Sequence, residues 1–453
     1  MDPVPHPIGS RLTVRITDLN HDGQGVGRAG DQVVFVEGAL PGETVEVLVR
    51  HRAKRHLLAE HRSTLLLSPD RRKPPCILAE RCGGCSVQHL DYAAQTRWKQ
   101  DQVQQALRRI GGFDLIVAPI LSAEAPLGYR NRAVIPLERT AEGKVRAGFY
   151  RSGSHRIVNM NRCPVLDPRL DRLIAPLKAD LEASDWPIDV DLADEGGLRH
   201  LALRIGQHTG EVLITLISSH RELPGLEAMA QGWMERWSEL VGVGLNLQPR
   251  SGNTLLGAST EWIAGRPWLL ERFAGLELRI ATDTFFQVNT AQAERLVPLI
   301  QHALEPAPGV KLVDAYCGIG TFSLPLAAAG ASVLGLEQHE GSVLQASANA
   351  ERNGLDQCRF LATDVDTALA DALQDADGLL LDPPRKGLSA TLCATVAAAA
   401  PQRVAYVSCH PATLARDLSL LCEDGRLQLK SVQPIDFFPQ TSHVESLAVL
   451  QRS

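Results

Sequence analysis

Hydrophobic and polar positions change their pattern twice along the chain. Residues 11–68 alternate apolar and polar side chains in short runs, as half-buried strands do, with turn-forming Gly, Asn and Asp between the runs. Short strands at this spacing predict a small β-barrel of the oligonucleotide-binding type. Residues 90–110 have a helical period, and mixed helix and strand patterns follow up to residue 278. This second part is expected to be an α+β domain.

From about residue 279 onward, apolar strand-like runs alternate with helical segments rich in Ala and Leu. That order is typical of a parallel, doubly wound sheet, which binds its ligands at the carboxyl ends of the strands. We therefore expect an α/β multidomain protein with a barrel at 1–70, a central α+β domain at 71–278 and a Rossmann-like domain at 279–453. The helix near 90–112 is a candidate to pack on the last of these.

Composition excludes several classes of protein. Of the 453 residues, 44% are hydrophobic and 22% charged, which is ordinary globular usage and rules out a disordered, collagen-like or coiled-coil chain. No apolar run approaches the ~18 residues that cross a bilayer. The first thirty residues carry charges throughout, with no export signal. We expect a cytoplasmic protein that has no membrane partner and needs no obligate protein partner.

The net charge of −6 hides an asymmetry between the two parts of the chain. Residues 1–162 hold 24 Lys and Arg against 16 Asp and Glu, and the remainder holds 22 against 36. The basic excess is concentrated at 50–73 and 130–162, each with eight basic and two acidic side chains. A basic front half favours docking of a polyanion, nucleic acid first, although a solvated charged surface is the alternative.

Nine cysteines in a cytoplasmic chain are not expected to form structural disulfides. Four of them come early, with the spacing Cys76-x5-Cys82-x2-Cys85 and then Cys163. Four thiolates suit either zinc or an iron–sulfur cluster, and the spacing alone does not separate the two.

Acidic residues end three consecutive predicted strands. Asp314 precedes the glycines Gly318 and Gly320, Glu337 ends the next strand, and Asp364 ends the third. Such carboxylates can accept hydrogen bonds from ribose hydroxyls and an adenine amino group, although helix capping is the alternative reading. The glycine loop has no phosphate-binding lysine. An adenosyl ligand without phosphates therefore fits best, and S-adenosylmethionine is that ligand.

Two later strand ends carry further candidate chemistry. Asp382 stands in the run DPPRKG, and Cys409 stands in VSCHPATLARD. A cysteine at the end of a parallel strand, near the expected ligand, is well placed as a nucleophile, although most free cysteines are buried and inert.

Together with FFQVN at 285–289, DAYCGIGTF and QTSHVE, these runs resemble the RNA uracil-C5 methyltransferases over nearly the whole chain. The first domain resembles a TRAM domain, and the early cysteines resemble that family's [4Fe–4S] ligands Cys76, Cys82, Cys85 and Cys163. The resemblance implies Cys409 as nucleophile and Glu445 as base. The implied S-adenosylmethionine contacts are Gln287, Tyr316, Thr321, Glu337, Asp364 and Asp382. TRAM domain and cluster together imply the subgroup that methylates 23S ribosomal RNA, at uracil 1939.

The implied chemistry explains these residue types. Addition of a thiolate at C6 makes C5 of uracil nucleophilic, and a base must then remove the C5 proton. We expect the basic surroundings to lower the pKa of Cys409 below the free value of ~8.5. We also expect the uridine to flip out, with Phe285 and Phe286 available for stacking. The alternatives are the same reaction on transfer RNA, methylation of an exocyclic nitrogen, and a non-enzymatic RNA chaperone.

Overall fold

The computed structural model describes residues 6–190, 197–250, 252 and 254–453. The chain begins with a closed five-stranded barrel in the order β1-β2-β3-β5-β4. Its strands are β1 (Arg11–Leu19), β2 (Gly25–Ala29), β3 (Gln32–Val36), β4 (Thr44–Arg52) and β5 (His56–Leu66). Alternate positions such as Val45, Val47 and Val49 are fully buried inside the barrel, which confirms the expected alternation.

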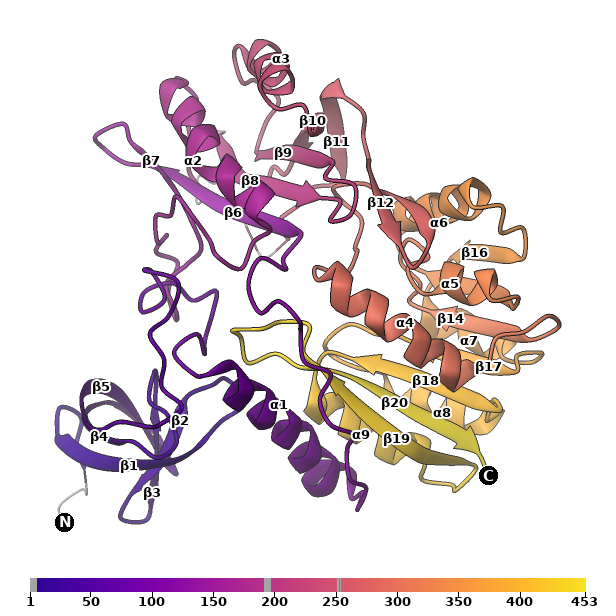
Figure 1. Cartoon of the computed structure of the whole chain (residues 1–453), viewed down its shortest axis with the longest axis horizontal. Helices are drawn as coiled ribbons and strands as arrows, with labels where there is room; N and C mark the ends of the chain where they lie inside the picture. Colours follow the sequence, from indigo (N-terminus) through magenta and orange to yellow (C-terminus); the bar gives the residue numbers. More distant parts are fainter. Residues whose placement is uncertain (1–5, 191–196, 251, 253) are drawn as a thin grey trace.

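Helix α1 (Tyr92–Ala106) follows the linker after the barrel and ends in a turn of π-helix, Leu107–Gly111. Asp91 caps its first turn by accepting a hydrogen bond from the amide of Ala93 at 3.1 Å. The buried Val103 and Leu107 join a core shared with α9 and β19 of the last part of the chain. At its other end, Ala94 and Trp98 pack with Leu19 and Leu40 of the barrel, so the helix lies between the barrel and the C-terminal sheet (Figure 1).

The central part is a six-stranded sheet in the order β11-β10-β9-β8-β6-β7, covered by two helices. Its elements are β6 (Arg132–Arg139), β7 (Val145–Ala147), α2 (Pro168–Ala183), β8 (Leu198–Ile205), β9 (Val212–Ser218), α3 (Leu226–Arg236), β10 (Leu240–Leu247) and β11 (Ser259–Gly265). A hairpin of β12 (Leu269–Phe273) and β13 (Leu276–Ile280) follows. The domain boundary expected at residue 278 falls within β13.

The last part is a seven-stranded sheet in the order β16-β15-β14-β17-β18-β20-β19. Its elements are α4 (Thr290–Leu304), β14 (Lys311–Ala315), α5 (Ser323–Ala328), β15 (Ser332–Glu337), α6 (Glu340–Arg352), β16 (Cys358–Ala362), α7 (Val365–Ala372), β17 (Gly378–Leu381), α8 (Ala390–Ala399), β18 (Arg403–Ser408), α9 (Pro411–Leu421), β19 (Leu427–Ile435) and β20 (Glu445–Arg452). The five strands β14 to β18 are parallel, as predicted, and β20 and β19 are antiparallel additions.

Neighbouring residues of these strands face two separate cores. Leu312 and Leu380 pack with α4, α5 and α6, whereas Val313 and Leu379 pack with α1, α7, α8 and α9. Strand β14 lies between β15 and β17, so the strand order reverses there, and a ligand site is expected at the carboxyl ends beside it. In the described part of the chain, no helix is both long and apolar enough to cross a bilayer.

Candidate active site

A cavity of about 830 Å³ opens where the parallel strands end. The side chains that line it come from most of the strand ends of the sheet and from the segment that precedes α4. Among them are Gln287, Tyr316, Glu337, Asp364, Asp382, Cys409 and Glu445. Thr321 is buried in the loop after Gly320 and does not line the cavity.

The loop after β14 shapes one wall of the cavity. Tyr316 and Gly318 both have left-handed backbone conformations, with φ of 71° and 55°. A non-glycine residue in this region is strained, and such strain gathers at functional sites. The turn aims the amide of Gly318 at Glu337 Oε2, 3.1 Å away, while the amide of His339 donates to Glu337 Oε1 at 2.8 Å. The carboxylate is thus fixed at the cavity wall.

Asp364 serves two purposes in the structure. Its Oδ1 accepts a hydrogen bond from the amide of Asp366 at 2.8 Å, so it caps the N-terminus of α7. It also lines the cavity. The capping alternative weighed from the sequence is therefore correct for this residue, and it does not remove the side chain from the site.

Two acids at the site have raised pKa values, namely the buried Asp314 and the half-buried Asp382, which lines the cavity. Burial raises the pKa of Asp314 to about 7, helped by the charges of Asp382 and Glu337. Burial also raises the pKa of Asp382 to about 7. Gln287 Nε2 lies 3.5 Å from Asp382 Oδ2. The backbone carbonyl of Gln287 accepts a hydrogen bond of 2.8 Å from Asn131 Nδ2, so the central part of the chain holds this wall in place.

Cys409 follows β18 directly, and His410 caps the N-terminus of α9. The thiol is half-buried. Burial raises its pKa to about 12, and the charges of Glu445 and Asp382 add to this increase, against a smaller lowering by Arg385. The expectation of a lowered thiol pKa is therefore wrong, because desolvation and the charges of two acids outweigh the charge of the one basic side chain that lowers this pKa.

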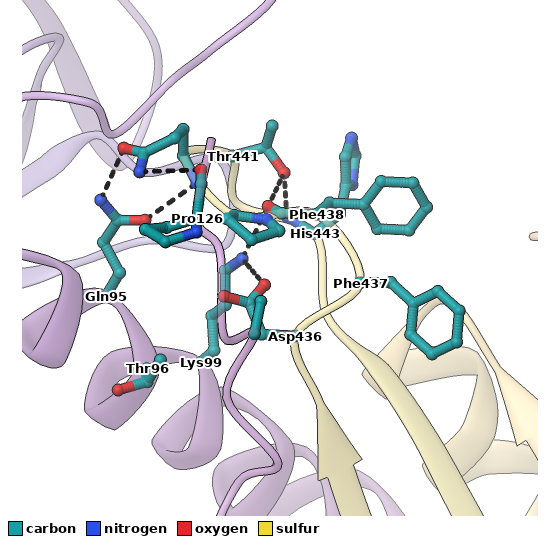
Figure 2. Close-up of polar contacts among 12 residues, drawn as sticks. Gln95, Thr96, Lys99, Pro126, Asp436, Phe437, Phe438, Thr441 and His443 are labelled. Carbon is teal, nitrogen blue, oxygen red and sulfur yellow. Dashed lines mark hydrogen bonds and ion pairs between the residues drawn. The ribbon is translucent and has the colours of Figure 1, made fainter. Parts of the chain in front are cut away.

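Glu445 begins β20 and is 6% exposed. Burial raises its pKa to about 8, with a further increase from the charge of Asp382. The segment that leads into it, residues 436–444, is held by α1 (Figure 2). We call these contacts between α1 and residues 436–444 the α1 clasp.

The centre of the α1 clasp is an ion pair with no exposed surface on either side chain. Lys99 Nζ donates to Asp436 Oδ1 at 2.6 Å and to the carbonyl of Phe438 at 2.9 Å. One helical turn away, Gln95 exchanges two hydrogen bonds of 3.0 Å with the side chain and amide of Gln440. Figure 2 shows these contacts on one face of α1. They position the segment that carries Phe438, which lines the cavity.

The two aromatic side chains expected to stack on a base are in different environments. Phe285 is 56% exposed and lines the cavity. Phe286 is 3% exposed, and its ring packs edge-on against Phe273 with 5.5 Å between centroids. Phe286 is therefore a core residue. The sequence reading missed the lining residues Asp283 and Phe438, although each lies within two residues of a quoted motif.

The four early cysteines lie outside this cavity and close to one another. Burial raises the pKa of Cys85 to about 11 and that of Cys163 to about 12. The charge of Cys76 contributes to the increase in both pKa values. Burial raises the pKa of Cys82 too, and Cys76 contributes again. The donors thus suit a thiolate-bound metal in number and type. Among the described ranges, no three Cys, His, Asp or Glu side chains are already gathered as a metal site, so the cysteines suit a metal by number and type only.

Part of the basic stretch at 50–73 has a structural role. Arg71 donates to both oxygens of the fully buried Glu43, and Arg72 pairs with Asp91 at 3.2 Å. Arg50 and Arg62 share the carboxylate of Glu60. Within the described residues, Arg52, Lys54, Arg55 and Lys73 make no ion pair, and they carry the free positive charge of this stretch.

A family model described as tRNA (Uracil-5-)-methyltransferase matches residues 91–453. The chain belongs to this family of RNA uracil methyltransferases. The residues matched by the family model include both the central sheet and the sheet that bears the cavity. A second model, the TRAM domain, matches residues 6–60, which are the barrel.

Relatives of this uracil methyltransferase cover the chain almost completely. Proteins named "uncharacterized RNA methyltransferase" are 51% identical in Parasynechococcus marenigrum, over 99% of this chain and 97% of theirs, and 36% identical in Halalkalibacterium halodurans, over 98% of both. A crystal structure of Pyrococcus abyssi tRNA (uracil-54, C5)-methyltransferase with S-adenosyl-L-homocysteine superimposes with a TM-score of 0.78. It is 28% identical and covers 97% of this chain and 100% of that one.

Proposed function

We propose that the protein methylates C5 of a uridine in RNA, with Cys409 as the nucleophile and Glu445 as the base. The observation that carries this proposal is the shared cavity. It gathers a thiol, a protonatable carboxyl group and Asp382 from three different strand ends, beside the side chains suited to an adenosyl ligand.

Binding of S-adenosylmethionine is assigned to the wall formed by the ends of β14, β15 and β16. Glu337 is fixed by two backbone amides and offers its remaining lone pairs to ribose hydroxyls. Asp364, Tyr316 and Gln287 complete the proposed contacts, with Asp382 between this wall and Cys409. Thr321 is left out because it does not line the cavity. S-adenosylmethionine, when bound, supplies an electrophilic methyl group.

The chain's own residues perform the remaining steps. Cys409 Sγ adds as the thiolate to C6 of uracil, and the electron pair of the C5–C6 bond moves toward the O4 carbonyl as an enolate. C5 then takes the methyl group. Glu445 removes the C5 proton, the C5–C6 double bond re-forms, and the Sγ–C6 bond breaks with its electron pair returning to the Cys409 thiolate. A carboxyl group with a raised pKa is a stronger base than an ordinary one, which suits Glu445 to this step.

The RNA must present its uridine unstacked, because the cavity lies at the edge of the sheet and cannot hold a duplex. Phe285 is the exposed ring at the cavity that can stack on the displaced base. The barrel with its unpaired cations offers phosphate contacts that do not depend on sequence.

Since the proposed substrate is cellular RNA, we also propose a cytoplasmic location.

For the substrate we propose 23S ribosomal RNA, at the uridine that the resemblance implies, on the grounds of the barrel and the four cysteines. Transfer RNA is the second candidate, and a specific observation favours it. The Pyrococcus abyssi enzyme, whose name gives tRNA uracil-54 as its target, superimposes over its full length, so this overall architecture is compatible with a tRNA substrate.

We propose further that Cys76, Cys82, Cys85 and Cys163 hold a [4Fe–4S] cluster with a structural or RNA-docking role. Their mutual electrostatic influence supports the proposal. Iron and acid-labile sulfide, measured after anaerobic purification, should each approach four per chain. One zinc per chain, or no metal, would rule the cluster out. Substitution of Cys82 by Ser should remove the bound metal without abolishing S-adenosylmethionine binding.

The test of the main proposal is covalent capture. RNA that carries 5-fluorouridine has no C5 proton to lose, so it should remain bonded to Cys409 in the presence of S-adenosylmethionine. The complex should survive denaturing electrophoresis and disappear in Cys409→Ala. Capture by Cys409→Ala, or no capture by the parent protein while S-adenosylmethionine binds, would refute the mechanism. RNA binding without S-adenosylmethionine binding would point to a chaperone instead.

Mapping of 5-methyluridine in both 23S and transfer RNA from a deletion strain separates the two substrates.

A further inference from the structure

A second hollow, of about 250 Å³, lies in the central part of the chain, away from the catalytic cavity. Its lining includes Arg81, Arg146, Arg151 and Arg156. None of these four residues belongs to the lining of the larger cavity. Pockets for drug-sized ligands have volumes of roughly 300–1,000 Å³. This hollow is smaller, so it suits a single compact group rather than a whole cofactor.

The four arginines are brought together by separate segments. Arg81 lies just before Cys82, Arg146 lies in β7, and Arg151 and Arg156 lie in the loop after β7. The amide of Gly83 donates to the carbonyl of Tyr150 at 2.8 Å, which joins the cysteine loop to the loop after β7. The amide of Arg151 donates to the carbonyl of Arg156 at 2.9 Å, so these two residues face each other across a tight turn.

The charge in the hollow is largely uncompensated. Arg146 pairs with Glu138 at 2.9 Å. For the side chains of Arg81, Arg151 and Arg156, the described part of the structure shows no ion pair with a carboxylate, and all three are exposed. Lys178 adds a further cation nearby, since its Nζ lies 3.2 Å from Oδ1 of the lining residue Asn159.

Gathered guanidinium groups repel one another unless an anion lies between them. Guanidinium groups match the geometry of phosphate oxygens and can bind them in pairs. We propose that this arginine hollow binds a phosphodiester group of the RNA backbone, outside the catalytic cavity. This inference rests on the proposed function, because it takes the substrate of the protein to be RNA.

The position of the hollow fits an extended RNA. In Figure 1 the barrel, the linker after it and the loops after β7 lie along one side of the molecule, and the sheet that bears the catalytic cavity lies on the other. The barrel contributes unpaired cations to this side. A strand that reaches the catalytic cavity would then be held by its phosphates on the barrel and in the arginine hollow, with no reading of bases at either place.

The experiment measures the salt dependence of binding to a fluorescein-labelled 20-nucleotide oligouridylate by fluorescence anisotropy. The test variant is R81Q/R151Q/R156Q. The slope of log affinity against log salt should become shallower by roughly 0.7 for each phosphate that the variant no longer neutralises. The matched control R172Q/R221Q/R236Q removes three arginines of the same central part that are paired with carboxylates, namely with Glu239, with Glu227 and Glu261, and with Asp180.

The control should keep the parental slope. An unchanged slope in the test variant, or an equal change in the control, would overturn the proposal. R151Q/R156Q leaves the cysteine loop untouched and should give a smaller change of the same sign, so a folding defect near Cys82 cannot explain the result. Binding of millimolar inorganic phosphate to the parent but not to the test variant, without any displacement of the oligouridylate at constant ionic strength, would show a free-phosphate site and refute the assignment to RNA.

The same experiment separates this proposal from the proposed function. Binding of S-adenosylmethionine, measured by calorimetry, should be equal in the parent and in both triple variants. If the parent fails to bind S-adenosylmethionine or to capture 5-fluorouridine RNA, the proposed function fails. The slopes for oligouridylate still decide whether the arginine hollow binds RNA, because they require no catalysis.

Discussion

Replacing Lys99 with Met should open the α1 clasp and slow catalysis, although Lys99 itself does not line the cavity. Lys99 and Asp436 are both fully buried and 2.6 Å apart. Removal of one partner of a buried ion pair costs roughly 3–5 kcal/mol, because the other charge is left buried without compensation. At about 1.4 kcal/mol per factor of ten, local opening of the α1 clasp should become roughly 100- to 4,000-fold more frequent.

Native-state hydrogen exchange is the suitable assay, because a chain with a barrel and two large separate sheets is not expected to unfold in a single step. Peptides from residues 92–106 and 436–444 should exchange faster in Lys99→Met, while barrel peptides keep their parental rates. The lysine also donates to the carbonyl of Phe438, and Glu445 follows the held segment. We therefore expect a lower kcat for RNA methylation with an unchanged affinity for S-adenosylmethionine.

Two controls make this prediction specific. Lys99→Met combined with Asp436→Leu removes both charges and should recover most of the lost protection, since apolar replacement of a whole buried pair is often neutral. Lys144→Met breaks an exposed pair with Glu182, 2.8 Å apart, and should leave exchange unchanged. Parental exchange in Lys99→Met, or no recovery in the double variant, would refute the reasoning.

Three other predictions concern the cavity itself. Because the pKa of Glu445 is raised to about 8, its base form dominates only above that pH, so turnover should rise by at least about tenfold per pH unit below 8, and a flat profile from pH 6 to 9 would contradict this role. Glu445→Gln should stop turnover after methyl transfer and accumulate a covalent complex with ordinary RNA on denaturing gels. Phe285→Ala should raise KM for RNA and leave S-adenosylhomocysteine affinity unchanged, whereas Phe286→Ala should lower the melting temperature by removing a core ring, at a cost of roughly 3–5 kcal/mol.

The cavity at the strand ends could be predicted from the sequence because parallel strands impose a simple rule. Residues that follow successive strands meet at one edge of the sheet, whatever their distance in the chain. Glu337, Asp364 and Cys409 were singled out on this basis, and the structure brings them into one cavity. Helix capping by Asp364 was also foreseen, because an acidic residue before a helix is a recognisable signal.

The α1 clasp carries no comparable signal. Lys99 and Asp436 are 337 positions apart, and nothing in the sequence around either residue points to the other. Only the packing of α1 on β19 and α9 buries them together. The core position of Phe286 could not be predicted from the sequence either. Its neighbour Phe285 is the same residue type, and only the fold decides which ring faces the core.

The error about Cys409 has a physical cause that applies more widely. The sequence reading weighed charges along the chain, but the pKa of a thiol depends on desolvation and on the few charges that share its pocket. Glu445 and Asp382 share that pocket and oppose ionisation, and Arg385 only partly offsets them. A resting thiol held protonated in this way is a poor target for stray electrophiles. In the mechanism that we propose, positive charge brought into the cavity, such as that of a sulfonium group, would favour the thiolate form of Cys409 over the thiol.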